Sequence, residues 1–229
     1  MSKNCTLEEI AGLLLKNGSF VLCPHVSPDG DALGSTLALK MALEKAGKQV
    51  TVMVDDDVPK AFGFLPQLDS FVKPDVNNPV VTDLLVVLDA SSLDRIGKVA
   101  QAVKYNAMVN IDHHISNTQY ADYLYLNTEA AATGEILCAL VEKLDVTPDK
   151  DLATCLYTAI YTELRSFRFA NTTPATMRAA AKLLEYGARP NEISDALGTH
   201  TRANIEMLGK VLQTLSFYAP VLLPPGHHP

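Results

Sequence analysis

Three short segments of the chain combine carboxylate and imidazole side chains, and each of them follows an apolar run. Residues 25–31 read His-Val-Ser-Pro-Asp-Gly-Asp, Asp89 follows the run 84–88, and residues 112–114 read Asp-His-His after the run 107–111. Apolar runs of this length that end in polar turns are typical of buried strands. Because the carboxyl ends of neighbouring parallel strands meet at one edge of a sheet, we expect these side chains to converge there.

The candidate ligands are suited to a hard or borderline divalent cation. A proline and a glycine force the first segment into a tight loop, in which His25, Asp29 and Asp31 can turn toward one point. Asp89 and His113 would arrive from neighbouring strands. Carboxylate and imidazole without thiolate favour Mn²⁺ or Mg²⁺ over structural zinc. Five ligands exceed the needs of one ion with an open position, whereas two ions about 4 Å apart and bridged by Asp89 fit the count and imply in-line displacement at phosphorus.

Each segment also has a purely structural interpretation. Asp-Gly-Asp at 29–31 is most often a solvated turn whose carboxylates bond local backbone amides. Asp89 could cap the next element, and residues 112–114 could form a polar loop. Three such segments, each after a strand, would be an improbable coincidence, and their conjunction favours the metal site.

The apolar runs predict an α/β fold in which a parallel β-sheet is flanked by helices and followed by a helical C-terminal segment. The strand runs are continuously apolar rather than alternating, which is typical of strands buried on both faces. Strands are expected over 20–23, 49–54, 84–88 and 107–111. Helices are expected over 6–16, 32–46, 94–104, 134–144, 147–162, 173–186, 191–197 and 202–217. We expect a catalytic domain over 1–190, a helical linker over 191–218, and a truncated or disordered proline-rich tail over 219–229.

Composition narrows the class of protein. The chain has 229 residues and a formal charge of −7, with 48% hydrophobic and 20% charged residues, as in a globular protein. It has no run of Lys or Arg, so we expect no binding to duplex nucleic acid. The four cysteines form no C-x-x-C pair, which predicts free thiols in a reducing compartment. No run is long enough to span a bilayer, and the polar start does not resemble a signal peptide, so we expect a cytoplasmic protein without a membrane partner.

Several motifs resemble a known family. In order and spacing, His25-x-x-x-Asp29-x-Asp31, Asp89 and Asp112-His113-His114 resemble the first three motifs of the DHH phosphoesterases. The stretches 88–97, 112–117 and 133–137 resemble its nano-RNase/pAp-phosphatase branch, the bifunctional oligoribonucleases and PAP phosphatases. The resemblance extends over about residues 5–215.

The resemblance implies a pair of Mn²⁺ ions, with Mg²⁺ or another divalent ion as an alternative. In that arrangement His25 and Asp29 would hold one ion, Asp31 and His113 would hold the other, and Asp89 would bridge the two.

The resemblance also implies catalytic roles and a substrate class. Asp112 would orient an imidazole, and His114 would face the scissile phosphate as a hydrogen-bond donor or acid. The attacking species would be a metal-activated water. The implied substrates are short oligoribonucleotides, dinucleotides or the 3′-phosphate of pAp. The oligomeric state stays open, with a homodimer as one option.

Two departures from the family pattern stand out. The fourth motif of the family is Asp-Thr-Gly, whereas residues 163–165 are Glu-Leu-Arg. Glu163 is one methylene longer than Asp and could still bind metal, while Arg165 could contact a substrate phosphate, obstruct the pocket or simply face solvent. Second, the family typically carries a smaller DHHA1 domain with a Gly-Gly-Gly-His motif, and we expect this chain to lack it.

Three functions remain open from the sequence. The leading hypothesis is a Mn²⁺-dependent phosphohydrolase acting on short oligonucleotides or pAp. A manganese inorganic pyrophosphatase would share the ligands at the strand ends, although residues 116–117 and 166–169 resemble the nucleotide branch. A degenerate metal- or nucleotide-binding module without turnover would explain both departures.

Overall fold

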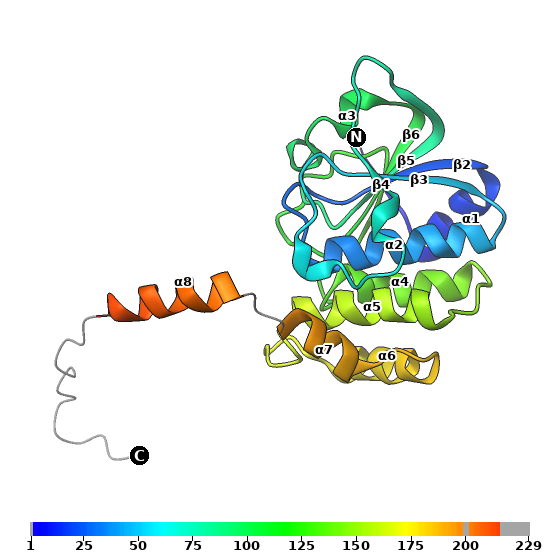
Figure 1. The fold of residues 1–229 in the computed structure, drawn as a ribbon. Helices are drawn as coiled ribbons and strands as arrows, with labels where there is room; N and C mark the ends of the chain where they lie inside the picture. The colour runs from blue at the N-terminus through cyan, green and yellow to red at the C-terminus, as the bar shows by residue number, and fades with distance from the viewer. Residues whose placement is uncertain (1, 199–201, 216–229) are drawn as a thin grey trace, which may run out of the picture. The chain divides into compact units, whose positions relative to one another are not determined.

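The computed structural model describes residues 2–198 and 202–215, and within these ranges the strands form one seven-stranded sheet (Figure 1). The strand order is β1-β7-β6-β5-β2-β3-β4, and every adjacent pair is parallel. The strands are β1 (Lys3–Asn4), β2 (Ser19–Cys23), β3 (Gln49–Met53), β4 (Phe71–Val72), β5 (Val80–Leu88), β6 (Val103–Asp112) and β7 (Tyr123–Leu126). The expected α/β class, with a parallel sheet flanked by helices and a helical C-terminal segment, is confirmed.

All four predicted strands are present, as β2, β3, β5 and β6. Three further strands were not predicted because they are short and lie at or next to the edges of the sheet. Strands β1 and β4 have two residues each, and β7 has four. Strands β5 and β6 also begin four residues earlier than expected, at Val80 and Val103. Two of the first four residues of each strand are polar, so these positions lack a continuous apolar signal.

The predicted helices are present with shifted ends. The α-helices are α1 (Leu7–Lys16), α2 (Gly30–Lys45), α3 (Val99–Ala102), α4 (Thr133–Lys143), α5 (Lys150–Glu163), α6 (Pro174–Glu185), α7 (Pro190–Gly198) and α8 (Arg202–Gln213), and short 3-10 turns span η1 (Lys60–Phe62), η2 (Leu68–Ser70) and η3 (Leu93–Ile96). The helix expected over 94–104 is wrong as one element, because Gly97 at φ 56° separates η3 from α3. Helix α5 begins at Lys150 rather than near 147, because Asp149 accepts a hydrogen bond from the Leu152 amide and caps it.

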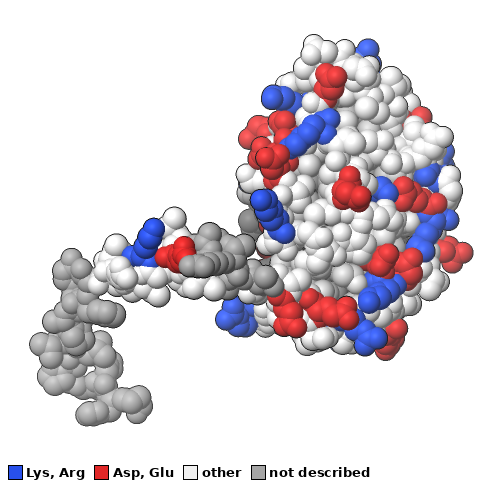
Figure 2. All heavy atoms as spheres, viewed as in Figure 1, with Lys and Arg blue, Asp and Glu red and all other residues white. Residues whose placement is uncertain are grey.

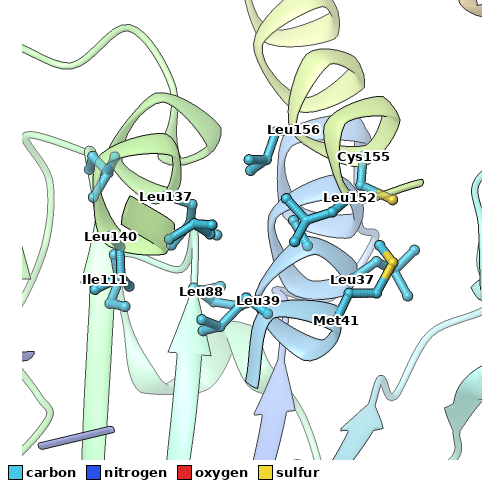
Figure 3. Close-up of a cluster of buried hydrophobic side chains, with 14 of the residues drawn as sticks. Leu37, Leu39, Met41, Leu88, Ile111, Leu137, Leu140, Leu152, Cys155 and Leu156 are labelled. Carbon is cyan, nitrogen blue, oxygen red and sulfur yellow. The ribbon is translucent and has the colours of Figure 1, made fainter. Parts of the chain in front are cut away.

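One face of the sheet packs against α2, which lies between the sheet and α5 (Figure 1). Buried side chains from β5, β6, α2, α4 and α5 form this core (Figure 3). Two glycines allow the helix backbones to approach closely. A Cβ at Gly34 would lie 2.4 Å from the Cys155 carbonyl oxygen, and one at Gly134 would lie 2.5 Å from Cβ of Ala159. This close packing fixes the N-termini of α2 and α4 against α5.

The opposite face carries a smaller apolar cluster beneath α3, which includes Val21, Cys23, Val87 and Met108. All four cysteines are free, as expected. On the face shown in Figure 2, acidic and basic side chains are interspersed.

The chain divides into two compact units, one ending at Leu197 and one from Gly198 onward. Within the first unit, α7 buries Ile193 in the main core. In the second unit, α8 is the helix described. The predicted tail, 219–229, and residues 216–218 lie outside the described residues. In the ranges the structure describes, no helix combines the length and apolarity needed to cross a bilayer.

Candidate metal centre

The three segments that carry candidate ligands follow three neighbouring strands. Strands β6, β5 and β2 are adjacent in the sheet: β5 ends directly before Asp89, β2 ends two residues before His25, and β6 ends at Asp112. The segments therefore meet at the carboxyl edge of the sheet, where open α/β folds place their ligands.

The first cluster joins the loop after β2 to the end of β5. Nε2 of His25 lies 3.8 Å from Oδ2 of Asp29 and 3.7 Å from Oδ2 of Asp89. Asp29 also caps α2, since its Oδ1 accepts a hydrogen bond of 3.0 Å from the Ala32 amide. Burial raises the pKa of Asp29, but its contacts with His25 and the Ala32 amide outweigh this and leave the pKa below its usual value.

The second cluster uses the other oxygen of Asp89. Nε2 of His113 lies 3.5 Å from Oδ1 of Asp89 and 3.8 Å from Oδ2 of Asp31. Asp89 has a left-handed backbone, with φ 59°, which turns its carboxylate into the centre directly after the strand. Asp89 therefore directs one oxygen toward each imidazole.

The tautomers of both imidazoles are fixed by backbone carbonyls. Nδ1 of His25 lies 2.7 Å from the Val26 oxygen, and Nδ1 of His113 lies 3.3 Å from the Ala130 oxygen. Each Nδ1 therefore donates its proton, so each Nε2 turns a lone pair toward carboxylate oxygens. Nε2 of His113 is buried without a hydrogen-bond partner. Without a cation, an imidazole lone pair that faces carboxylate oxygens at the separations given above is repelled by them. Two donor atoms that each lie about 2.1 Å from a shared ion have a separation of the same order as these imidazole–carboxylate distances.

The N-terminus of α4 holds Asp31 in place. Its Oδ2 accepts a hydrogen bond from the Thr133 amide (2.7 Å), and its Oδ1 accepts bonds from the Gly134 amide (2.8 Å) and the Ser35 hydroxyl (3.1 Å). Burial raises the pKa of Asp31 to about 6, although the amides of Gly134 and Thr133 act in the opposite direction. In the same way, burial and the neighbouring Asp31 carboxylate raise the pKa of Asp89 well above its usual value. Carboxylates crowded in this manner favour a bound cation.

His114 has a different environment from His113. Its Nδ1 donates to Oδ1 of Asp112 at 2.7 Å, and this hydrogen bond raises the pKa of His114 above its usual value. The other oxygen of Asp112 accepts a hydrogen bond of 2.6 Å from Nδ2 of Asn117. Burial raises the pKa of Asp112, but the bonds from His114 and Asn117 prevail and lower it. Asp112 is thus an anionic hydrogen-bond partner that orients His114.

Comparison with known proteins identifies the family. Residues 19–160 match the DHH family, N-terminal domain. The chain belongs to the DHH family. The bifunctional oligoribonuclease and PAP phosphatase NrnA of Thermus thermophilus is 35% identical over 212 residues, which cover 93% of this chain and 64% of that protein. The protein of the same name from Bacillus subtilis is 26% identical over 205 residues, which cover 86% of this chain and 63% of that protein. The chain therefore spans just under two thirds of the length of these relatives.

A solved structure shares the fold of this chain. The crystal structure of an exopolyphosphatase-related protein from Bacteroides fragilis superposes with a TM-score of 0.82 at 23% identity, covering 93% of this chain and 66% of that chain. The predicted resemblance to the nano-RNase/pAp-phosphatase branch is confirmed by the relatives' names.

The altered fourth DHH motif lies at the end of α5. Among the described residues, two groups of three potential ligands have atoms within 4.8 Å of one another, His25–Asp29–Asp89 and Asp89–His113–His114, and Glu163 belongs to neither. Glu163 is nevertheless coupled electrostatically to the centre: burial and the nearby Asp31 carboxylate raise its pKa, whereas His113 lowers it. Asp31 is likewise outside both groups, although its Oδ2 lies 3.8 Å from Nε2 of His113.

Arg165 occupies a left-handed position that a glycine would adopt without strain. Its φ is 43°, and Ser166 and Phe167 follow at 63° and 61°. The Arg165 guanidinium lies over the Phe169 ring, with Cζ 5.3 Å from the ring centroid. The DHH pattern has Gly at this position, so the substitution places a side chain where the family has none.

Two further residues support the site. Thr133 bonds candidate ligands directly, and Asn110 reaches Asp112 through Asn117. The Thr133 hydroxyl donates to Oδ1 of Asp89 at 2.9 Å, in addition to the bond from its amide to Asp31. Asn110 accepts a hydrogen bond of 2.8 Å from Asn117, the residue that bonds Asp112. Thr133 resembles an ordinary helix start, but a fully buried Asn in an apolar strand is a polar residue that demands partners. In the sequence, Asn110 interrupts the apolar run 107–111, and this interruption is the signal from which its role could have been inferred.

Proposed function

We propose that the chain carries the centre of a two-metal, Mn²⁺-dependent phosphoesterase that hydrolyses short oligonucleotides, dinucleotides or the 3′-phosphate of pAp. The observation that carries the proposal is the orientation of Asp89. Its Oδ2 lies 3.7 Å from Nε2 of His25, and its Oδ1 lies 3.5 Å from Nε2 of His113. A buried carboxylate between two imidazole lone pairs is the arrangement of a ligand shared by two cations.

The residues divide into two sets around Asp89. His25 and Asp29 would hold one ion with it, and Asp31 and His113 would hold the other. Bound divalent ions supply positive charge for the phosphoryl oxygens and lower the pKa of a coordinated water. The protein contributes fixed tautomers, burial and the N-terminus of α4, which hold the ligands at their positions before the cations bind.

His114 is suited to donate a hydrogen bond or a proton during the reaction. Its Nδ1 is occupied by Asp112, so Nε2 is the ring nitrogen available to substrate, and the side chain is 41% exposed. The raised pKa of His114 keeps the ring protonated to a higher pH than an ordinary histidine. His114 would therefore donate a hydrogen bond or a proton from Nε2 to a phosphate oxygen or to the leaving oxygen.

Support for the substrate class comes from the relatives, whose names specify oligoribonuclease and PAP phosphatase activity. Glu163 would add a ligand near Asp31 and His113, in keeping with its electrostatic coupling to both residues. Arg165 would contribute a positive charge beside the centre for a substrate phosphate. Both roles depend on small movements at the end of α5 when the cations bind.

The test measures binding and turnover in the same sample. Calorimetric titration of the chain with Mn²⁺ should give two ions per chain, and release of mononucleotide from a dinucleotide or of phosphate from pAp should require Mn²⁺. Asp89→Asn should abolish both. Asp57→Asn is the matched control, since its carboxylate is 99% exposed and pairs with Lys73 on the surface. Two bound ions with faster turnover of pyrophosphate than of nucleotide would indicate a pyrophosphatase instead.

A second candidate function is a binding module without turnover. It is favoured by one observation, the strained Arg165 in place of the family's glycine, which could hold Glu163 away from the centre. This alternative predicts Mn²⁺ binding without release of product. Replacing residues 163–165 with Asp-Thr-Gly would then raise the rate substantially, whereas the leading proposal expects a modest change.

A further inference from the structure

One amide side chain connects the turn that carries Asp89 with the residues that orient His114. Asn110 lies in β6, two residues before Asp112, and its side chain is fully buried. Nearby apolar residues on this face include Val87 and Met108. An amide in such surroundings is destabilising unless all its hydrogen-bonding groups are satisfied, so its bonds indicate why the chain has an amide there.

The amide nitrogen of Asn110 holds the turn that carries Asp89. Nδ2 donates to the Val87 carbonyl at 3.2 Å and to the Ala90 carbonyl at 3.3 Å. These two carbonyls flank Asp89 along the chain, and Asp89 itself has the left-handed φ of 59°. A left-handed backbone is unfavourable for a non-glycine residue and persists only where its surroundings impose it. Asn110 is one of the groups that impose it.

The amide oxygen of Asn110 is bonded to the residues that orient His114. Its Oδ1 accepts a hydrogen bond of 2.8 Å from Nδ2 of Asn117, and that same nitrogen donates to Oδ2 of Asp112 at 2.6 Å. Asp112 in turn accepts the Nδ1 proton of His114 at 2.7 Å. A continuous chain of hydrogen bonds therefore runs from the turn at Asp89 through Asn110 to the His114 ring.

We infer that Asn110 is a positioning residue that sets the bridging carboxylate of Asp89 and, through Asn117, the imidazole of His114. The inference rests on the proposed function, because it assigns Asn110 to the alignment of a shared metal ligand with a proton donor. Asn110 is not among the proposed cation ligands, and its side-chain hydrogen bonds go to Val87, Ala90 and Asn117. Its effect is to keep Asp89 and His114 in one fixed relation, which in-line displacement requires.

Tyr120 provides a matched control. Its hydroxyl donates to the Ala90 carbonyl at 3.0 Å, so it bonds one of the two carbonyls that Asn110 bonds. It has no bond to Val87 or to Asn117. Tyr120→Phe therefore removes support from the same turn while leaving the connection to His114 intact.

The experiment compares Asn110→Leu, Asn117→Ala and Tyr120→Phe with the unaltered chain. Asn110→Leu should weaken Mn²⁺ binding in calorimetry and lower kcat, each by about 10- to 100-fold, the range for groups that orient metal ligands. Asn117→Ala should lower kcat with a smaller change in Mn²⁺ affinity, because it cuts the part of the network that leads to His114. Tyr120→Phe should change both by less than about threefold.

Several outcomes would overturn the inference. One is an Asn110→Leu chain that is folded by circular dichroism yet matches Tyr120→Phe in both Mn²⁺ affinity and kcat. If Asn110→Leu does not fold, Asn117→Ala decides, and an unchanged kcat in that variant refutes the connection to His114. Absence of Mn²⁺ binding and turnover in the unaltered chain would instead refute the proposed function, so the two failures are distinct.

Discussion

Gly30 lies directly against Thr162: a Cβ at position 30 would be 2.2 Å from the Thr162 hydroxyl oxygen. This contact joins the N-terminus of α2, which is capped by Asp29 and carries Asp31 in its first turn, to the last turn of α5, which carries Glu163. The first and fourth motifs of the family therefore approach closely because residue 30 has no side chain.

Gly30→Ala should separate these two elements. The new methyl group cannot occupy a space that the Thr162 side chain already fills, so the chain should lose about 1–3 kcal/mol of unfolding free energy. Mn²⁺ affinity should fall with it, because α2 and its capping residue Asp29 would shift. Denaturant unfolding and calorimetry measure the two effects.

Gly12→Ala is the control for this prediction. Gly12 lies inside α1, and a Cβ there would meet nothing within 4 Å. Alanine should stabilise the helix by about 0.5–1 kcal/mol without affecting the metal centre. Equal effects at positions 12 and 30 would show that the close contact with Thr162 has no consequence for the centre.

Single-ligand variants should separate the two cation sites. Asp29→Asn removes a ligand from the first cluster alone and should leave one Mn²⁺ per chain in calorimetric titration. Asp89→Asn removes the shared ligand, so neither cation should bind in the same concentration range. One retained ion in Asp89→Asn would mean that the carboxylate is not shared.

His114→Asn should separate binding from turnover. The variant removes the Nε2 group proposed to act on the phosphate but none of the proposed cation ligands. We expect two bound Mn²⁺ ions and a kcat reduced by about 10²- to 10⁴-fold, the usual contribution of a general acid. A loss of Mn²⁺ binding in this variant would instead place His114 among the ligands, as its proximity to Asp89 and His113 allows.

The strand ends could be predicted from the sequence because their signal is local. The runs before His25 and Asp89 are continuously apolar, the run before Asp112 is interrupted only by Asn110, and parallel strands bring such ends to one edge of the sheet. The division of the two imidazoles between the ions came from the resemblance to the DHH phosphoesterases, whereas a shared role for Asp89 was predicted from the number of ligands. Its left-handed backbone was not, because the conformation depends on Asn110 from a neighbouring strand.

The roles of α4 and α5 could not be predicted for the same reason. Thr133 and Gly134 have the pattern of an ordinary helix start, and only the tertiary structure brings their amides to Asp31, about a hundred positions earlier in the chain. Close packing of α5 on α2 depends on Gly34, and an isolated helical glycine has several interpretations in a sequence. Non-local contacts, rather than weak patterns, limited the prediction.

The stability of the metal-free chain should depend on pH through Asp31. Its pKa is raised from 3.8 to about 6 by burial, so the folded state binds a proton that the unfolded state has released. Unfolding free energy should therefore decrease as pH rises from about 4 to about 6, and Mn²⁺ affinity should decrease as pH falls through the same window. The difference between the unaltered chain and Asp31→Asn, measured by denaturant unfolding across this range, isolates the effect. A difference that does not vary with pH would contradict it.

Variants of Arg165 can separate the effect of its backbone strain on stability from the effect of its charge on substrate binding. Because its φ is 43°, Arg165→Gly should be more stable than Arg165→Ala by about 1 kcal/mol, since both lose the side chain and only glycine relieves the strain. At Arg168, where φ is not positive, the order should reverse, with Arg168→Ala the more stable. Denaturant unfolding of the four variants gives both orders. If the Arg165 guanidinium contacts a substrate phosphate, Arg165→Gly and Arg165→Ala should raise KM for pAp equally, because they lack the same charge. A KM that follows stability instead would assign the residue to the backbone of the turn and not to the substrate.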